Sequence, residues 1–148
     1  MNTEQADANY LSRTQVKIGL ITTLVGLFVF TMGAKPEWYG VDRSPIVGFV
    51  QIAVFLVGLA IICVGGFIEI NALWGDDERS IAADIGLRLV ATGYVLALFT
   101  GMADVFGMGT QPLPGVPFFG PIQSIGVEIG QGVILFGFLL AIPRKKKE

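Results

Sequence analysis

The sequence predicts an all-α integral membrane protein, built as a bundle of four transmembrane helices. Three observations lead to this fold class. First, 53% of the 148 residues are hydrophobic and only 15% are charged, whereas soluble domains carry roughly 25% charged residues. Second, four apolar stretches are long enough, at about 1.5 Å per helical residue, to cross a hydrocarbon core about 30 Å thick. Third, short segments rich in polar residues, glycine or proline separate these stretches.

The first transmembrane helix is expected at about residues 18–34, after a polar cytoplasmic tail at residues 1–17. Its glycines, Gly19, Gly26 and Gly33, recur every seven residues and therefore share one face of the helix. Small residues on one face let a neighbouring helix approach closely in a membrane. We therefore expect this helix to pack against another helix through its glycine face.

The second helix is expected at about residues 46–72 and repeats the same glycine spacing at Gly58 and Gly65. The loop before it is short, so the first two helices are neighbours along the chain. The matching spacing predicts that they pack against each other as a hairpin.

The third and fourth helices are expected at about residues 80–106 and 122–142, followed by a cytoplasmic tail at residues 143–148. The connection from Gly107 to Pro121 contains four prolines, which exclude a regular helix there. We interpret the whole chain as a single transmembrane domain.

The distribution of basic residues predicts a cell-membrane protein with both termini in the cytoplasm. Four spans place both termini on one side, and the tails and the middle loop on that side carry most of the lysine and arginine. Lys35 and Arg43 are the basic residues of the two opposite loops. The terminal cluster is either a plain orientation signal or a contact for anionic lipid, at about 1 kcal/mol per basic residue. Its members are Arg144, Lys145, Lys146 and Lys147.

The two halves of the chain share short sequence similarities. The segment FTMGA at 30–34 resembles FTGMA at 99–103, and the tripeptide around Gln51 resembles the one around Glu128. These matches indicate a duplicated helical hairpin, with chance similarity as the alternative. A duplication would make the halves a parallel repeat, with Gln51 and Glu128 at equivalent positions.

Glu128 is the main candidate for a functional residue, because an ionisable side chain inside an apolar span is costly. Gly126 and Gly130 flank it, so a neighbouring helix is expected close to it. Two roles remain open for its carboxyl group. One is proton exchange in a transporter, and the other is a buried hydrogen bond to Gln51, to Tyr94 or to another subunit.

Four further charged residues are candidates for a polar role in or near the spans. Asp84 and Arg88 are four residues apart, acid first, which is the favourable order for an ion pair on one helix face. Glu69 is expected nearby, so the three residues would form an ion-pair cluster; the alternative is that Arg88 extends to the lipid headgroups. Asp104 is either a solvated residue near the outer interface or a vestibule charge leading toward Glu128.

Several classes of function are excluded or disfavoured by residues that the sequence lacks. It contains no histidine and one cysteine, Cys63, which excludes histidine-dependent catalytic groups and an intrachain disulfide. We find no nucleotide-binding loop, zinc motif or nucleophile motif, and the only basic cluster adjoins a hydrophobic span, which argues against nucleic-acid binding. We therefore expect no enzyme activity, no cofactor and no bound metal.

The sequence favours a non-enzymatic membrane protein, either an accessory or scaffold subunit of a membrane complex or a homo-oligomer. Its partners would be the lipid bilayer and other membrane subunits. The alternative is a small proton-coupled transporter or channel that uses Glu128, with Gln51 and Asp104 along an outer pathway.

Overall fold

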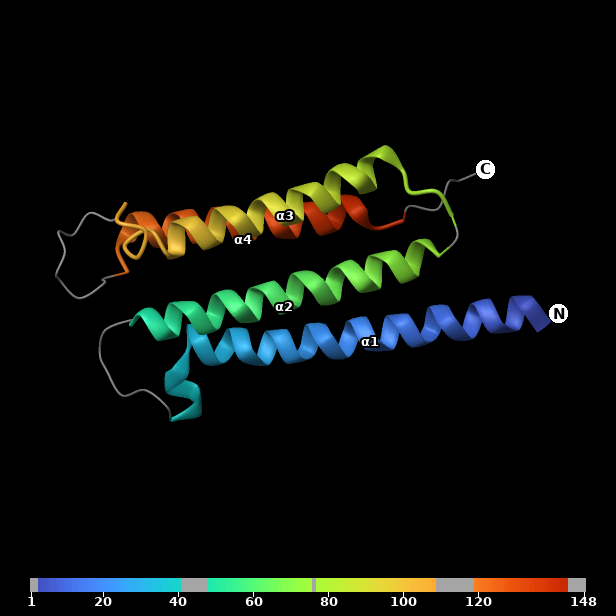
Figure 1. Cartoon of the computed structure of the whole chain (residues 1–148), viewed down its shortest axis with the longest axis horizontal. Helices are drawn as coiled ribbons and strands as arrows, with labels where there is room; N and C mark the ends of the chain where they lie inside the picture. The colour runs from blue at the N-terminus through green and yellow to red at the C-terminus, as the bar shows by residue number, and fades with distance from the viewer. Residues whose placement is uncertain (1–2, 41–47, 76, 109–118, 144–148) are drawn as a thin grey trace.

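Four long α-helices form two hairpins that lie side by side (Figure 1). The computed structural model describes residues 3–40, 48–75, 77–108 and 119–143. Over these residues the elements are α1 (Thr3–Ala34), the 3-10 helix η1 (Pro36–Tyr39), α2 (Phe49–Trp74), α3 (Ile81–Gly101) and α4 (Pro121–Ala141). Within them there is no strand, and each of the four α-helices contains a segment long and apolar enough to cross a membrane. The expected all-α fold class is confirmed.

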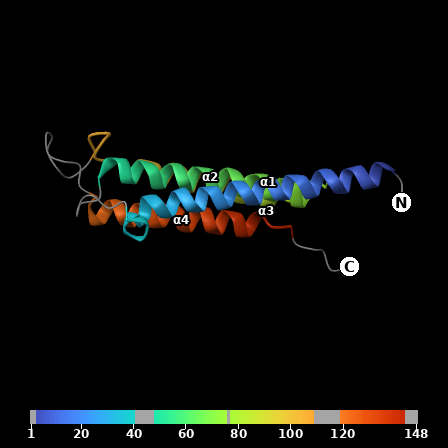
Figure 2. The ribbon, with the colours of Figure 1, turned by 90° about the horizontal axis from the view of Figure 1, so that it is seen from below.

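The helices run along the long axis of the bundle, and α1 extends beyond the others at its N-terminal end (Figures 1 and 2). The first turn of α1 and the last turn of α4 lie at the same end of the bundle (Figure 1). Residues 3–17 continue the helix, although we expected residues 1–17 to be a tail. Residues 3–17 contain no glycine or proline that would interrupt a helix. The helix can therefore begin well before the apolar stretch from which we placed its start.

Helix α3 is shorter than expected, because it ends at Gly101 rather than near residue 106. The chain then makes a series of turns up to Gly107, whose backbone N–H donates a 3.2 Å hydrogen bond to the carbonyl of Asp104. Gly107 has a φ of 72°, a left-handed conformation that glycine adopts without steric cost. Asp104 therefore lies in a turn beyond α3 and not inside a helix.

Local hydrogen bonds fix the starts of α3 and α4. Ser80 caps α3, since its Oγ accepts a 3.2 Å hydrogen bond from the backbone N–H of Ala83. At α4, the Gln123 side chain accepts a 2.8 Å hydrogen bond from the backbone N–H of Gly120. Pro121 occupies the first helical position, where the missing N–H costs nothing.

Glycines allow the backbones of α1 and α2 to touch. A Cβ atom added to Gly26 would lie 2.7 Å from the backbone nitrogen of Ile62 and 3.0 Å from the carbonyl oxygen of Gly58. Gly19 faces Gly65 and Glu69 in the same way, one seven-residue step earlier. The predicted glycine-packed hairpin is confirmed, and its contacts involve backbone atoms that leave no room for a side chain.

The second hairpin repeats the packing of the first. A Cβ atom on Gly93 of α3 would lie 2.6 Å from the carbonyl oxygen of Gly130 and 2.9 Å from the nitrogen of Ile134 on α4. Gly93 lies 67 residues after Gly26 in the sequence. The residues that these two glycines contact are 72 residues apart, since Gly130 and Ile134 take the places of Gly58 and Ile62.

The same two offsets relate a second set of contacts. Gly19 faces the carbonyl of Gly65 in the first hairpin, and Gly86 faces the carbonyl of Gly137 in the second. The two hairpins therefore have equivalent internal packing.

This packing register corrects the alignment expected between the halves. With an offset of 72 between α2 and α4, Gln51 corresponds to Gln123, and Glu128 corresponds to Leu56. The short sequence matches had placed Gln51 opposite Glu128. Glycine positions give the better alignment, because close backbone contact restricts them more tightly than lipid-facing positions.

Helix α2 connects the two hairpins. Among the described elements, α1 contacts α2 and η1, whereas α2 also contacts α3 and α4. The buried side chains between the hairpins come from α2, α3 and α4, with Leu56 almost fully covered. The indole N–H of Trp74 adds a 2.9 Å hydrogen bond to the carbonyl of Ala141, which joins α2 to α4 near the chain termini.

Candidate functional site

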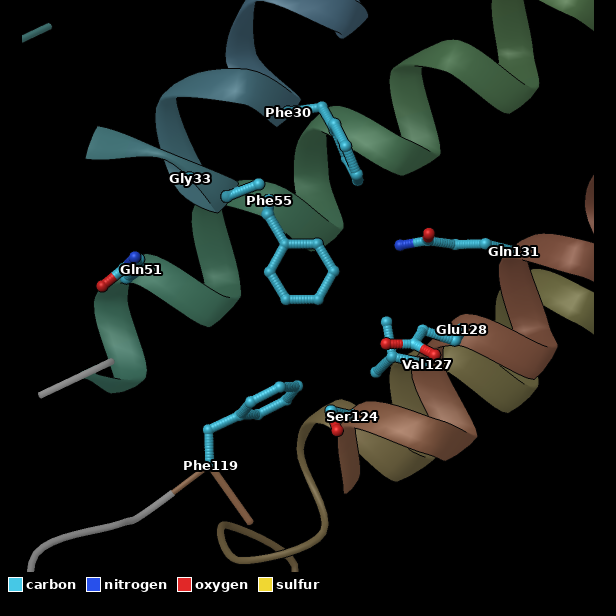
Figure 3. Close-up of a pocket in the computed structure, with 10 residues that line it drawn as sticks. Phe30, Gly33, Gln51, Phe55, Phe119, Ser124, Val127, Glu128 and Gln131 are labelled. Carbon is cyan, nitrogen blue, oxygen red and sulfur yellow. The ribbon is translucent and has the colours of Figure 1, made fainter. Parts of the chain in front are cut away.

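An open cavity of about 300 Å³ lies between the two hairpins. It is near the end of the bundle where α1 ends and α2 and α4 begin, opposite the end closed by Trp74 and Ala141. Residues of α1 and α2 form one wall, and residues of α4 with the preceding Phe119 form the other (Figure 3). The cavity therefore lies at the boundary between two tightly packed units.

Three phenylalanine rings make much of the cavity apolar. Phe30 and Phe55 pack edge to face, with ring centroids 5.8 Å apart. Phe55 is buried and belongs to the hydrophobic core between the hairpins. Phe119 approaches from the other wall, and Figure 3 shows all three rings directed into the space between the hairpins.

The polar side of the cavity comes from one face of α4. Ser124, Glu128 and Gln131 are separated by four and three residues, which places them on the same side of the helix. The Ser124 hydroxyl donates to the carbonyl of Pro121 at 2.9 Å. The side chains of Glu128 and Gln131 extend from α4 toward the opposite hairpin (Figure 3).

The carboxylate of Glu128 has no partner within the part of the chain that the structure describes. The side chain is exposed, and no hydrogen bond or ion pair joins it to another described residue. The lining side chains in that part of the chain include no lysine or arginine. Among the described lining residues, the cavity thus carries one acidic group and no basic group to neutralise it.

Within the described part of the chain, Glu128 forms no hydrogen bond to Gln51 or Tyr94; a hydrogen bond to another subunit stays a prediction. Gln51 lines the same cavity, but Figure 3 shows its amide at the far edge, directed away from the carboxylate. Tyr94 is not among the lining residues. The glycines beside Glu128 do bring a helix close, as expected. That helix is α3, where Thr100 contacts Gly126. Glu128 itself faces the cavity.

The remaining candidate residues lie apart from this cavity. Asp104 is in the turn after α3 and is not a lining residue. Glu69 accepts a 3.0 Å hydrogen bond from the Thr23 hydroxyl, between α1 and α2. Asp84 and Arg88 are exposed, and no ion pair joins them to each other or to Glu69. The basic cluster at 144–147 lies outside the described residues.

Several residues of the cavity were not anticipated. Gln131 was visible in the sequence, since it lies three residues after Glu128 and shares its helix face. Phe30, Phe55 and Phe119 carried no such signal, because apolar spans contain many phenylalanines. Their convergence depends on how one hairpin is placed against the other.

The fold and this cavity define the class of protein: a small helical protein with four helices able to cross a membrane and an acidic cavity between two hairpins. Among residues 3–40, 48–75, 77–108 and 119–143, no group of three or more acidic, cysteine or histidine side chains could hold a metal ion. Comparisons with protein-family models, curated protein sequences and solved structures found no match to this chain.

Proposed function

We propose that this protein is a small proton-coupled membrane transporter, in which Glu128 takes up and releases protons at the cavity between the hairpins. The single observation that carries the proposal is the position of this carboxylate. It has no partner among the described residues and borders an open cavity between two separately packed units. The sequence alone favours an accessory role, and the open cavity beside Glu128 is the observation that supports transport.

The packing supports relative movement of the hairpins. Inside each hairpin, backbone atoms touch at glycines such as Gly26 and Gly93, so the paired helices form a rigid unit. Between the hairpins, the described helices meet only where α2 packs against α3 and α4. Transporters built from repeats move by rocking one rigid unit against another around a central site.

The chemistry of the cavity supports proton exchange. Ionisable residues in membrane spans are costly, and they mark proton or substrate pathways. Here the carboxyl group of Glu128 is exposed to an open cavity, and the side chains of Ser124 and Gln131 provide further polar atoms on the same wall. A carboxyl group at such a site can gain a proton from water and lose it again.

The test is proton flux into liposomes driven by a potassium diffusion potential. We expect liposomes containing the wild-type protein to acidify faster than protein-free liposomes, and Glu128→Gln to abolish the difference. Asp84→Asn is the matched control, since Asp84 is an exposed acid outside the cavity. Flux equal to that of protein-free liposomes, or unchanged flux in Glu128→Gln, would refute the proposal.

An accessory or scaffold subunit, or a homo-oligomer, is the second candidate. The observation that favours it is the low coverage of the spans, of which between 17% and 33% is buried inside the chain. On α4, Gly132 is exposed and has open space where a Cβ atom would lie, so another helix could approach there. Purification in mild detergent with mass spectrometry tests this: a stable partner chain or dimer supports it, and a lone monomer contradicts it.

A further inference from the structure

Over the described residues, the cavity between the hairpins combines aromatic rings with one carboxylate that no basic side chain neutralises. We propose that it binds an organic ammonium cation, such as a quaternary or alkylated amine, with the cationic group between Glu128 and the phenylalanine rings. The inference rests on the proposed function, because it names the substrate class of the same cavity. It is argued from the charge, the aromatic lining and the size of the site.

Charge selects a cation. Glu128 is the one acid among the described lining residues, and the other polar side chains there, Gln51, Ser124 and Gln131, are neutral. The nearest basic residue in sequence to a lining residue is Lys35, which follows Ala34, is exposed and is not part of the lining. A ligand with a positive charge would supply the partner that Glu128 lacks among these residues.

The aromatic lining selects an organic cation. The face of an aromatic ring carries negative electrostatic potential and attracts cations, and rings of this kind recognise quaternary ammonium groups. Phe30, Phe55 and Phe119 surround the space opposite Glu128 (Figure 3). Small inorganic cations need oxygen ligands in place of their hydration shell; the phenylalanine rings provide none, so their side of the cavity favours an organic cation.

The size and openness of the site select a small head group. A volume of about 300 Å³ is at the lower end of the range for small-molecule sites, roughly 300–1,000 Å³. The cavity is open to its surroundings, so an alkyl chain attached to the ammonium group could extend out of it. The ligand is therefore a free amphipathic amine or the ammonium head group of a lipid.

The binding test uses the purified full chain in detergent and isothermal titration calorimetry. The cationic probe is benzyltrimethylammonium, and benzenesulfonate is an anionic probe of similar size. We expect the wild type to bind the cation and not the anion. Glu128→Gln should weaken cation binding by about 10-fold or more, since it removes the negative charge that attracts the cation.

A second variant tests the aromatic wall. Phe119→Leu should weaken binding of benzyltrimethylammonium by roughly 2- to 5-fold, the range of a cation–π contact. Phe99→Leu is the matched control, because this ring is exposed on α3 and packs against Phe106 outside the cavity. Its affinity should equal that of the wild type.

Lysophosphatidylcholine, added in the same experiment, identifies the source of the cation. Competition by this lipid assigns the site to a head group, and binding of benzyltrimethylammonium without competition assigns it to a free amine. The inference is wrong if the wild type does not bind the cation, if the anion binds equally well, or if Glu128→Gln binds as the wild type does.

The two proposals can fail separately. Proton flux that depends on Glu128 without ammonium binding would contradict this inference and leave the transport function intact. Ammonium binding without proton flux would contradict the transport function and leave this inference intact.

Discussion

The hydroxyl of Thr23 on α1 donates a 3.0 Å hydrogen bond to the carboxylate of Glu69 on α2. The bond lies at a close contact between the two helices, because a Cβ atom on Gly65 would overlap Thr23. A glycine at that position thus allows the threonine to reach the acid on the facing helix. This polar contact stabilises α1 against α2, in a place where we had expected Glu69 to approach α3.

Replacing Thr23 with valine should lower the stability of the first hairpin. The change keeps the shape of the side chain and removes the donor, leaving the half-buried Glu69 without its partner. Interhelical hydrogen bonds in membranes contribute about 0.6 kcal/mol on average and up to about 1.7 kcal/mol. Thermal unfolding in detergent, followed by circular dichroism, would measure the loss.

Thr22→Val is the matched control for that measurement. The hydroxyl of Thr22 donates to the carbonyl of Ile18 on its own helix at 2.8 Å, so its removal leaves the interhelical contact intact. We expect a smaller change in melting temperature than for Thr23→Val. Equal changes in the two variants would show that the bond between Thr23 and Glu69 contributes no stability of its own.

The equivalent packing of the two hairpins makes a paired prediction. Gly26→Ala and Gly93→Ala each place a methyl group against backbone atoms of the facing helix, at 2.7 Å and 2.6 Å before any relaxation. Overpacking of this kind costs about 1–3 kcal/mol. Both variants should therefore lower the melting temperature in detergent by similar amounts.

Gly132→Ala provides the control for this pair, because a Cβ atom there meets nothing within 4 Å. Alanine favours helix over glycine by about 1 kcal/mol, so this variant should be neutral or slightly more stable. If only one of Gly26→Ala and Gly93→Ala destabilised the protein, the two hairpins would not be equivalent in energy.

The hairpins themselves were predictable from the sequence. The seven-residue spacing of Gly19, Gly26 and Gly33, matched by Gly58 and Gly65, is a property of helix periodicity and needs no tertiary information. The spans were predictable for the same reason, since hydropathy and length decide them. The end of α3 could not be predicted in this way, because the turns up to Gly107 depend on backbone conformations that hydropathy does not reveal.

The candidate site was predictable only in part. Glu128 stands out in the sequence because it is an acid inside an apolar span. Its surroundings could not be predicted, because the walls of the cavity come from two hairpins whose relative placement leaves no periodic signal. We chose the expected partner Gln51 and the expected pathway residue Asp104 by their positions along the chain. In the structure the Gln51 side chain points away from Glu128, and Asp104 lies outside the cavity.

Arg88→Met should leave the stability of the protein unchanged. Arg88 is exposed and forms no ion pair with Asp84 or Glu69, and surface substitutions usually change stability by no more than about 0.5 kcal/mol. Thermal unfolding in detergent is again the measurement. A large drop in melting temperature would show that the ion-pair cluster expected from the sequence does form in solution.

Trp74→Phe should weaken the contact between the hairpins and leave each hairpin intact. The indole N–H of Trp74 donates to the carbonyl of Ala141 at 2.9 Å, at the end of the bundle opposite the cavity. Phenylalanine keeps most of the apolar surface and removes this donor, at a cost of about 1 kcal/mol. Hydrogen exchange should therefore become faster near the end of α4 and stay unchanged at the glycine contacts around Gly26 and Gly93.

Trp38→Phe controls for the loss of a tryptophan, because Trp38 is 73% exposed in η1. It should leave exchange in α4 as it is in the wild type. If the hairpins rock against each other during transport, Trp74→Phe should also alter proton flux, since it removes a bond that holds them together at one end. Faster exchange near Ala141 with unchanged flux would indicate that opening this end of the bundle does not limit transport.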